Sequence, residues 1–128
     1  MTGWRPYGGR SGSGTDCRKD GELLYRGKLG AEPTVGMGYR AARQTAINLL
    51  SALRAEIGDL DRVRQIVKLF GLVNSAPGFN RQPEVINGAS ELLIEVFGEK
   101  GRHARSAVGM NELPYDTPVE IEMIVEIE

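Results

Sequence analysis

Two residues of opposite charge near the end of the chain have the types and spacing to do chemistry together. Arg105 lies in an expected strand over about 104–112, and Glu120 lies in the expected strand that follows it. A guanidinium can hold a carboxylate through two parallel hydrogen bonds, and a glutamate can position or deprotonate a water. If the two strands lie near one another, the pair could flank one cleft that binds a small carboxylate and delivers a proton or a water.

Both residues also have a structural explanation, which the residues alone favour. Arg105 could form an ion pair with a nearby glutamate. Glu120 could be a solvated strand residue like Glu122 and Glu126, which share its face of the expected strand. The choice between chemistry and structure therefore depends on the elements that position the pair.

Hydrophobic periodicity predicts those elements. Apolar residues at three- and four-residue steps predict an amphipathic helix over 35–57, which Thr34 caps and Gly58 ends. A second helix is expected to begin near Pro83 and to end at Gly98. Strands are expected over 21–27, 61–74, 104–112 and 119–128. In the last strand, apolar residues alternate with mainly acidic ones, which is the period of a β-strand.

The order β-α-β-α-β-β predicts an α/β (α+β) domain in which two helices cover one face of a sheet. The second face needs another partner, because strand 61–74 is apolar at both parities and Ile124 interrupts the acidic face of the last strand. Closed oligomers are the usual way to cover such a face. The sequence therefore predicts contacts with further copies of the chain.

The start of the chain has a different composition. Residues 1–21 contain six glycines and no Val, Ile, Leu or Phe. This composition is typical of a flexible loop or linker, so residues 1–20 are expected to be a flexible segment and residues 21–128 the folded domain. Cys17, within that segment, is expected to be a bystander thiol. His103 and Tyr115 are interpreted as surface or turn residues.

Composition excludes several classes of function. The chain has 128 residues, which fits one domain, and a formal net charge of -1, which does not favour nucleic acid or an anionic membrane as a partner. No apolar run approaches the roughly 20 residues that span a bilayer. One histidine and one cysteine cannot build a zinc cage. The single cysteine and the lack of a visible signal peptide favour a cytoplasmic protein.

From Gly21 to Glu128 the sequence resembles the RidA/YjgF family, which is also labelled endoribonuclease L-PSP. An Ala-Arg-Ser run, then Leu-Pro, then Val-Glu-Ile-Glu, at this spacing near the C-terminus, is a specific signature of that family. The Gly-Arg-His-Ala-Arg-Ser run is similar to a less-studied branch of it. The segments that carry the resemblance are 38–43, 60–63, 85–90, 103–106 and 119–122.

The resemblance implies a chorismate-mutase-like fold, with a mixed sheet, two helices on one face, and a homotrimer around a central β-barrel. The implied activity is the hydrolysis of reactive enamines and imines, such as 2-aminoacrylate, to 2-keto acids and ammonia. It implies neither a metal nor an organic cofactor, and its clefts lie between subunits.

The resemblance also assigns roles to individual residues. Arg105 matches the arginine that binds the substrate carboxylate, and Glu120 matches the glutamate that holds the attacking water. Asn87 matches a helix asparagine near the cleft, although a structural hydrogen bond explains this asparagine equally well. Ala107 stands where many members have a cysteine whose backbone helps to bind ligand. The implied ligand contacts are completed by a Ser-Gly pair, Ser13 and Gly14, whose preceding apolar strand is not visible in the sequence.

Two alternatives to the deaminase remain open. The altered start of the chain and Ala107 would also suit a non-catalytic trimer that binds a keto acid in the same cleft. The family label suggests a third function, ribonuclease action, for which the sequence offers no basic surface interleaved with aromatic residues.

Overall fold

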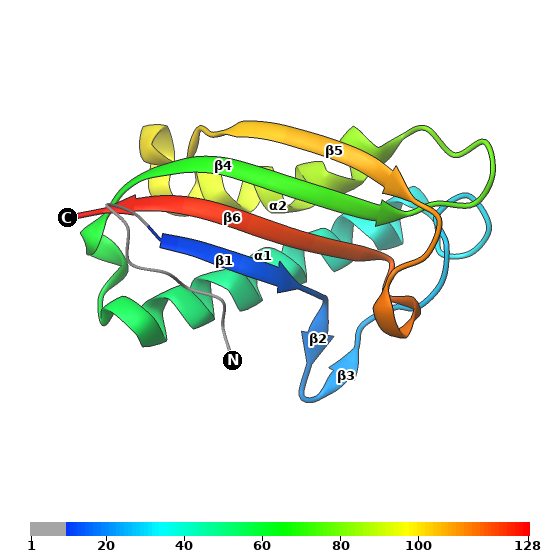
Figure 1. Ribbon diagram of the computed structural model, residues 1–128, viewed down its shortest axis with the longest axis horizontal. Coiled ribbons are helices and arrows are strands. Elements are labelled where there is room, and N and C mark those ends of the chain that lie inside the picture. The colour runs from blue at the N-terminus through cyan, green and yellow to red at the C-terminus, as the bar shows by residue number, and fades with distance from the viewer. Residues whose placement is uncertain (1–9) are drawn as a thin grey trace.

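The protein folds as a four-stranded sheet with two helices packed behind it (Figure 1). The computed structural model describes residues 10–128. The helices are α1 (Val35–Ile57) and α2 (Gln82–Phe97). The strands are β1 (Arg10–Thr15), β2 (Arg18–Lys19), β3 (Glu22–Leu23), β4 (Val63–Asn74), β5 (Ala104–Met110) and β6 (Val119–Ile127). Short 3-10 turns lie at Leu60–Arg62, Gly98–Gly101 and Pro114–Asp116.

The main sheet is mixed and has the strand order β1-β6-β4-β5. Strands β4 and β5 are parallel and are joined through α2, whereas β6 runs antiparallel to both β4 and β1. Both long helices cover the same face of this sheet (Figure 1). This arrangement confirms the predicted mixed α+β fold with two helices on one face. Neither helix combines the length and the apolar character that crossing a bilayer requires.

The two helices begin and end where local chemistry places their ends. The side chain of Thr34 accepts a hydrogen bond from the backbone N–H of Met37, and Gly58 adopts a positive φ just after α1 ends. A proline occupies the first turn of α2, and Gly98 follows its last residue. These four ends confirm the helix boundaries expected from the sequence.

A single hydrophobic core lies between the helices and the sheet. The helices cross closely at Gly88, where a Cβ would lie only 3.1 Å from the backbone nitrogen of Arg43 and would overlap the backbone of Tyr39. Alternate residues of β6 are fully buried against the helices and confirm the period-two prediction for that strand; they are Val119, Ile121, Met123 and Val125.

The first strand of the sheet was not expected. The composition analysis predicted no strand before residue 21, yet Arg10–Thr15 pairs with β6 along the edge of the sheet. The pattern of side chains could not reveal β1, because its sequence RSGSGT has no apolar alternation and the strand is held by the backbone pairing of a sheet edge. The expectation of a flexible segment is therefore wrong for this stretch, and residues 1–9 lie outside the described part of the chain.

The strand predicted over 21–27 is also shorter than expected. Only Glu22–Leu23 is extended, and it pairs with Arg18–Lys19 in a small hairpin outside the main sheet. Cys17, interpreted as a bystander thiol in a flexible segment, is instead fully buried in the core, with its Sγ 3.8 Å from Thr117 Oγ1. The main sheet thus takes its first strand from before Cys17 and not from after it.

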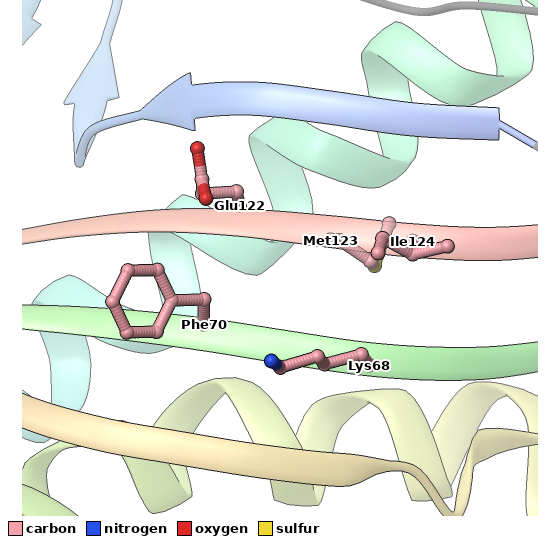
Figure 2. Close-up of a pocket in the computed structure, with 5 residues that line it drawn as sticks. All are labelled: Lys68, Phe70, Glu122, Met123 and Ile124. Atoms are coloured by element: carbon pink, nitrogen blue, oxygen red, sulfur yellow. The ribbon is translucent and has the colours of Figure 1, made fainter.

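The face of the sheet that points away from the helices carries apolar side chains with no cover in this chain. Figure 2 shows a shallow pocket on this face, with a volume of about 160 Å³, between β4 and β6. Phe70 and Lys68 come from β4, and Glu122 and Ile124 come from β6. Four large apolar side chains on β4, β5 and β6 are exposed to between 37% and 43%: Val67, Val108, Met110 and Ile124. A single chain therefore leaves this face unpacked, as the apolar pattern of strand 61–74 predicted.

Candidate active site

Arg105 projects from β5, an edge strand, toward helix α2. Its Nη1 atom donates to Asn87 Oδ1 at 2.8 Å and to Ser90 Oγ at 3.1 Å, and both acceptors lie on α2. The side chain is half-buried and lines a depression of about 230 Å³ together with Ser90, Ile94, Arg102 and His103. Among the side chains that the structure describes, no carboxylate pairs with Arg105. The structural ion pair considered from the sequence is therefore not formed within this part of the chain.

Two residues on the same side of the sheet extend the Arg105 contacts. Ser90 Oγ lies 2.9 Å from His103 Nε2, and His103 Nδ1 lies 2.6 Å from the carbonyl oxygen of Gly101. Burial lowers the pKa of His103 from its usual value, and the positive charge of Arg105 lowers it further. His103, expected to be a surface or turn residue, is thus half-buried in a hydrogen-bonded cluster next to Arg105.

Glu120 projects from β6 on the face of the sheet without helices. Partial burial raises the pKa of this carboxyl group, and the charges of Asp16 and Glu122 raise it further. A raised pKa makes a carboxylate a stronger base near neutral pH. Among the described side chains, no lysine or arginine forms an ion pair with Glu120, so its negative charge has no local compensation there.

The strand β1 approaches Glu120 so closely at Gly14 that a larger residue would displace the Glu120 side chain. A Cβ built on Gly14 would lie 2.8 Å from Glu120 Cδ and would overlap Oε2. The register of β1 against β6 is irregular between Gly12 and Thr15, which is where Gly14 meets this side chain. Gly14 therefore leaves the space that the Glu120 carboxylate occupies. Ser13 precedes it in β1, at the same irregular step of the strand.

Arg105 and Glu120 do not flank one cleft within the chain. In the ladder around β4, Arg105 is paired with Leu69, and Glu120 is paired with Leu72. Positions that differ by three residues in a regular strand point to opposite faces, and Leu69 belongs to the buried core on the helix side. The simple geometry considered from the sequence, one cleft between adjoining strands, is thus wrong for a single chain, because β4 lies between β5 and β6.

The remaining predicted residues fall near one or the other charged group. Asn87 accepts a hydrogen bond from Arg105 and so gains a defined position on α2. Ala107 follows Arg105 by two residues on the same face of β5, is paired in register with Gly71, and packs against the core. Within residues 10–128, no group of three His, Cys, Asp or Glu side chains is arranged to hold a metal ion.

Three residues of this arrangement were missed or undervalued from the sequence. Ser90 and His103 lie in two segments that carry the resemblance, 85–90 and 103–106, but neither residue was given a role in the site. An α-helix and a turn bring both of them to Arg105. Asp16 acts on Glu120 through space from the end of β1, a strand that the sequence did not reveal. The run of His103, Ala104 and Arg105 was the one available signal, since residues two apart in a strand share a face.

The mixed sheet with two helices on one face defines the class of chorismate-mutase-like α+β proteins. A family model described as "YjgF/chorismate mutase-like, putative endoribonuclease" matches residues 9–127, so the chain belongs to that family. The match begins at the strand β1 that the sequence reading had left out.

Similar proteins come from bacteria and from a protozoan. The chain is 51% identical over 102 residues to Protein TCP17 of Trypanosoma cruzi, a match that covers 79% of this chain and 64% of that protein. The chain thus spans less than two thirds of that relative's length.

Two solved structures have closely similar folds. The crystal structure of Atu1372 from Agrobacterium tumefaciens, a protein of unknown function, has a TM-score of 0.97 at 41% identity, covering 100% of this chain and 82% of that one. A "putative endoribonuclease" from Shewanella oneidensis has a TM-score of 0.95 at 33% identity, covering 99% and 85%. The yjgF gene product of E. coli shares the fold, with a TM-score of 0.68 at 22% identity. The match covers 98% of this chain and 86% of that one.

Proposed function

We propose that the protein hydrolyses reactive 2-imino acids, formed from enamines such as 2-aminoacrylate, to 2-keto acids and ammonia. The support begins with Arg105. Both hydrogens of its Nη1 atom are directed to neutral acceptors on α2, Asn87 and Ser90. The Nε and Nη2 hydrogens form the other edge of the guanidinium and can hold a substrate carboxylate through two parallel bonds. Such a clamp fixes the imine carbon relative to a water.

Glu120 supplies the base in this proposal. The substrate reacts as its protonated iminium. As the water oxygen bonds to the iminium carbon, Glu120 accepts a proton from the water and the electron pair of the C=N bond moves to nitrogen, which becomes a neutral amino group. Glu120 then returns its proton to that nitrogen, the C–N bond breaks as ammonia leaves, and loss of the hydroxyl proton to the ammonia yields the keto acid and ammonium. The raised pKa of Glu120 suits a group that must take up and return a proton near neutral pH.

The proposed active unit is a homotrimer in which Arg105 of one copy meets Glu120 of the next. Two observations support an assembly of this kind. The two residues lie on opposite faces of one sheet, each without a described partner of opposite charge. The face that carries Glu120 also exposes apolar side chains, among them Val67 and Ile124, that a second copy would cover.

The observation that carries the proposal is the half-buried Arg105 whose protein partners are neutral. The test is ammonia release from freshly generated 2-aminoacrylate, measured on protein whose mass in solution is known. Wild-type trimer should accelerate release, and Arg105→Ala should lower kcat/KM by about 100-fold or more, because a bidentate charged contact is lost. Arg102→Ala removes an exposed charge from the same depression and should have a small effect. A wild-type trimer that gives no acceleration contradicts the proposal.

A trimer that binds a keto acid without turning it over is a second candidate. It is favoured by one observation: the contacts that orient Arg105 are complete within a single chain, whereas Glu120 lies on the opposite face. Calorimetric binding of 2-oxobutanoate that depends on Arg105, together with no ammonia release, would select this candidate over the deaminase.

Ribonuclease action, the activity in the family description, has weaker support. The formal net charge of -1 supplies no electrostatic attraction for a phosphate backbone. RNA cleavage by purified protein that falls with Arg105→Ala would nevertheless establish it.

A further inference from the structure

The cluster beside Arg105 fixes the positions of its hydrogens by elimination. A carbonyl oxygen can only accept, so His103 Nδ1, which lies 2.6 Å from the oxygen of Gly101, must carry a hydrogen and donate it. In neutral histidine the other ring nitrogen, Nε2, is then an acceptor. Burial and the charge of Arg105 both lower the pKa of His103 and so favour this neutral form.

The acceptor on His103 determines the role of Ser90. Ser90 Oγ lies 2.9 Å from His103 Nε2 and therefore donates its hydroxyl hydrogen to that atom. The lone pairs of the same oxygen remain for Arg105, whose Nη1 donates to it at 3.1 Å. Ser90 itself is 91% buried, and each polar group from the Gly101 carbonyl to the Arg105 Nη1 atom has a hydrogen-bond partner.

This series of hydrogen bonds fixes the orientation of the Arg105 guanidinium. With Asn87 and Ser90 as acceptors, both Nη1 hydrogens of Arg105 are committed. The plane of the guanidinium is thereby fixed by two bonds from one helix. The edge formed by Nε and Nη2 has no partner among the described residues, and it is the edge that binds a carboxylate bidentately.

We propose that Ser90 and His103 are positioning residues that hold the Arg105 guanidinium in the orientation that binds the substrate carboxylate. The ligand class, a 2-keto or 2-imino acid, rests on the proposed function. The positioning itself rests on the contacts within this chain. Neither Ser90 nor His103 touches the substrate in this account, so both should act through affinity and not through the chemical step.

The Ser90–His103 contact also has the separation of a nucleophile and its base, and the contacts of Ser90 argue against that use. Its oxygen accepts from the Arg105 cation, which withdraws electron density from a would-be nucleophile, and the side chain is buried within α2. Covalent labelling of Ser90 by a fluorophosphonate would overturn the positioning role.

Two variants of His103 separate the functions of its two ring nitrogens. The side-chain amide of His103→Gln reaches the place of Nε2 and can accept from Ser90, whereas that of His103→Asn reaches only the place of Nδ1. We expect the dissociation constant of 2-oxobutanoate, measured by calorimetry, to rise about tenfold in Ser90→Ala and His103→Asn and about twofold or less in His103→Gln. In the deaminase assay, KM should rise with kcat nearly unchanged.

A spectroscopic readout keeps the test independent of turnover. Nitrogen-15 NMR of wild-type His103 should show the neutral ring with hydrogen on Nδ1, and Ser90→Ala should shift the Nε2 resonance, because that atom loses its donor. Wild-type protein that binds 2-oxobutanoate without releasing ammonia would contradict the proposed function and leave this inference standing.

Three results overturn the inference whatever the turnover. One is that Ser90→Ala and His103→Asn both bind 2-oxobutanoate as tightly as wild type does, even if these variants unfold at a lower temperature. Another is that His103→Gln and His103→Asn lose the same amount of affinity for 2-oxobutanoate. The third is a wild-type protein that binds no keto acid.

Discussion

Arg105 and Glu120 are both half-buried and both lack a described partner of opposite charge, yet their surroundings differ in kind. Arg105 is held by Asn87 and Ser90, neutral acceptors on a helix of the same chain. Glu120 lies on the opposite face of the sheet, where its nearest charged groups are other carboxylates and Gly14 leaves it room. One region orients a charge, and the other holds a charge in an unfavourable environment.

A single chain builds only one of these two regions completely. Orientation of Arg105 needs only the packing of α2 against β5, and the fold supplies it. Glu120 gains a raised pKa, which suits a base, at some cost in stability. The account therefore assigns binding to the helix side, proton transfer to the open side, and catalysis to the contact between two copies.

The largest expected effect comes from removing that contact. Ile124→Lys places a charge on the open face of the sheet and should prevent assembly of the proposed trimer, with loss of nearly all of the proposed deaminase activity. Ile47→Lys is the matched control, because Ile47 is similarly exposed but lies on α1. Mass in solution by light scattering checks both variants. An active Ile124→Lys monomer would contradict the assembly, and with it the sharing of the site.

A smaller but still large effect is expected at Gly14. Gly14→Ala forces a methyl group against Glu120 and should lower kcat by about tenfold or more, with KM nearly unchanged, since the change displaces the base and leaves the α2 contacts that orient Arg105 intact. Gly36→Ala is the control, because the nearest atom to a Cβ there is 3.8 Å away. Steady-state kinetics on both variants measure the effect. A rise in KM with unchanged kcat would show that Gly14 contributes to substrate binding and not to the position of the base.

Because the pKa of Glu120 is raised, replacing its carboxyl group should moderately increase the stability of the folded protein. The folded protein binds this proton more tightly than the unfolded chain does, so wild type loses stability as pH rises through the folded-state pKa. Glu120→Gln should therefore melt a few degrees higher than wild type at pH 7 to 8, with no gain in acid near pH 4. Glu126→Gln, an exposed change on the same face, should show little difference. Calorimetry that finds Glu120→Gln less stable at neutral pH would contradict the account.

The smallest predicted effect concerns Asp16. Its negative charge is the largest contribution to the Glu120 pKa after burial, so Asp16→Asn should lower that pKa. The acid limb of the kcat profile should then move to lower pH, because Glu120 becomes ionised earlier in the titration. Asp61→Asn, in the turn before β4, should leave the profile in place. A shift of the limb to higher pH would show that another group limits the rate.

The long elements could be predicted because their side chains repeat with the period of the structure. Thr34 and Gly58 bound α1, and the alternation from Val119 onward identified β6. The strand β1 could not be predicted from RSGSGT, because its order comes from backbone pairing with β6 and not from an apolar face. The burial of Cys17 was not visible either, because it depends on contacts with residues distant in the sequence, among them Thr117.

The sequence could predict which residues belong to the candidate site, but not how they are arranged relative to one another. Arg105 and Glu120 stood out through the motif around each residue. Their separation by β4 was not visible, because strand order depends on the crossover through α2 and not on sequence neighbourhood. Ser90 was given no role and His103 was interpreted as a surface or turn residue, because their contact forms only when the turn at Gly98–Gly101 brings β5 against α2.

Mixed assemblies of two inactive variants show whether two copies of the chain share one site. Arg105→Ala and Glu120→Gln proteins, each inactive alone, would be unfolded together at equal concentrations, refolded into mixed trimers, and assayed with 2-aminoacrylate. A site built from Arg105 of one copy and Glu120 of the next is intact in about one quarter of the contacts in a random trimer, so activity should recover to about a quarter of wild type. Mixed trimers of proven composition that stay as inactive as their parents would contradict the account.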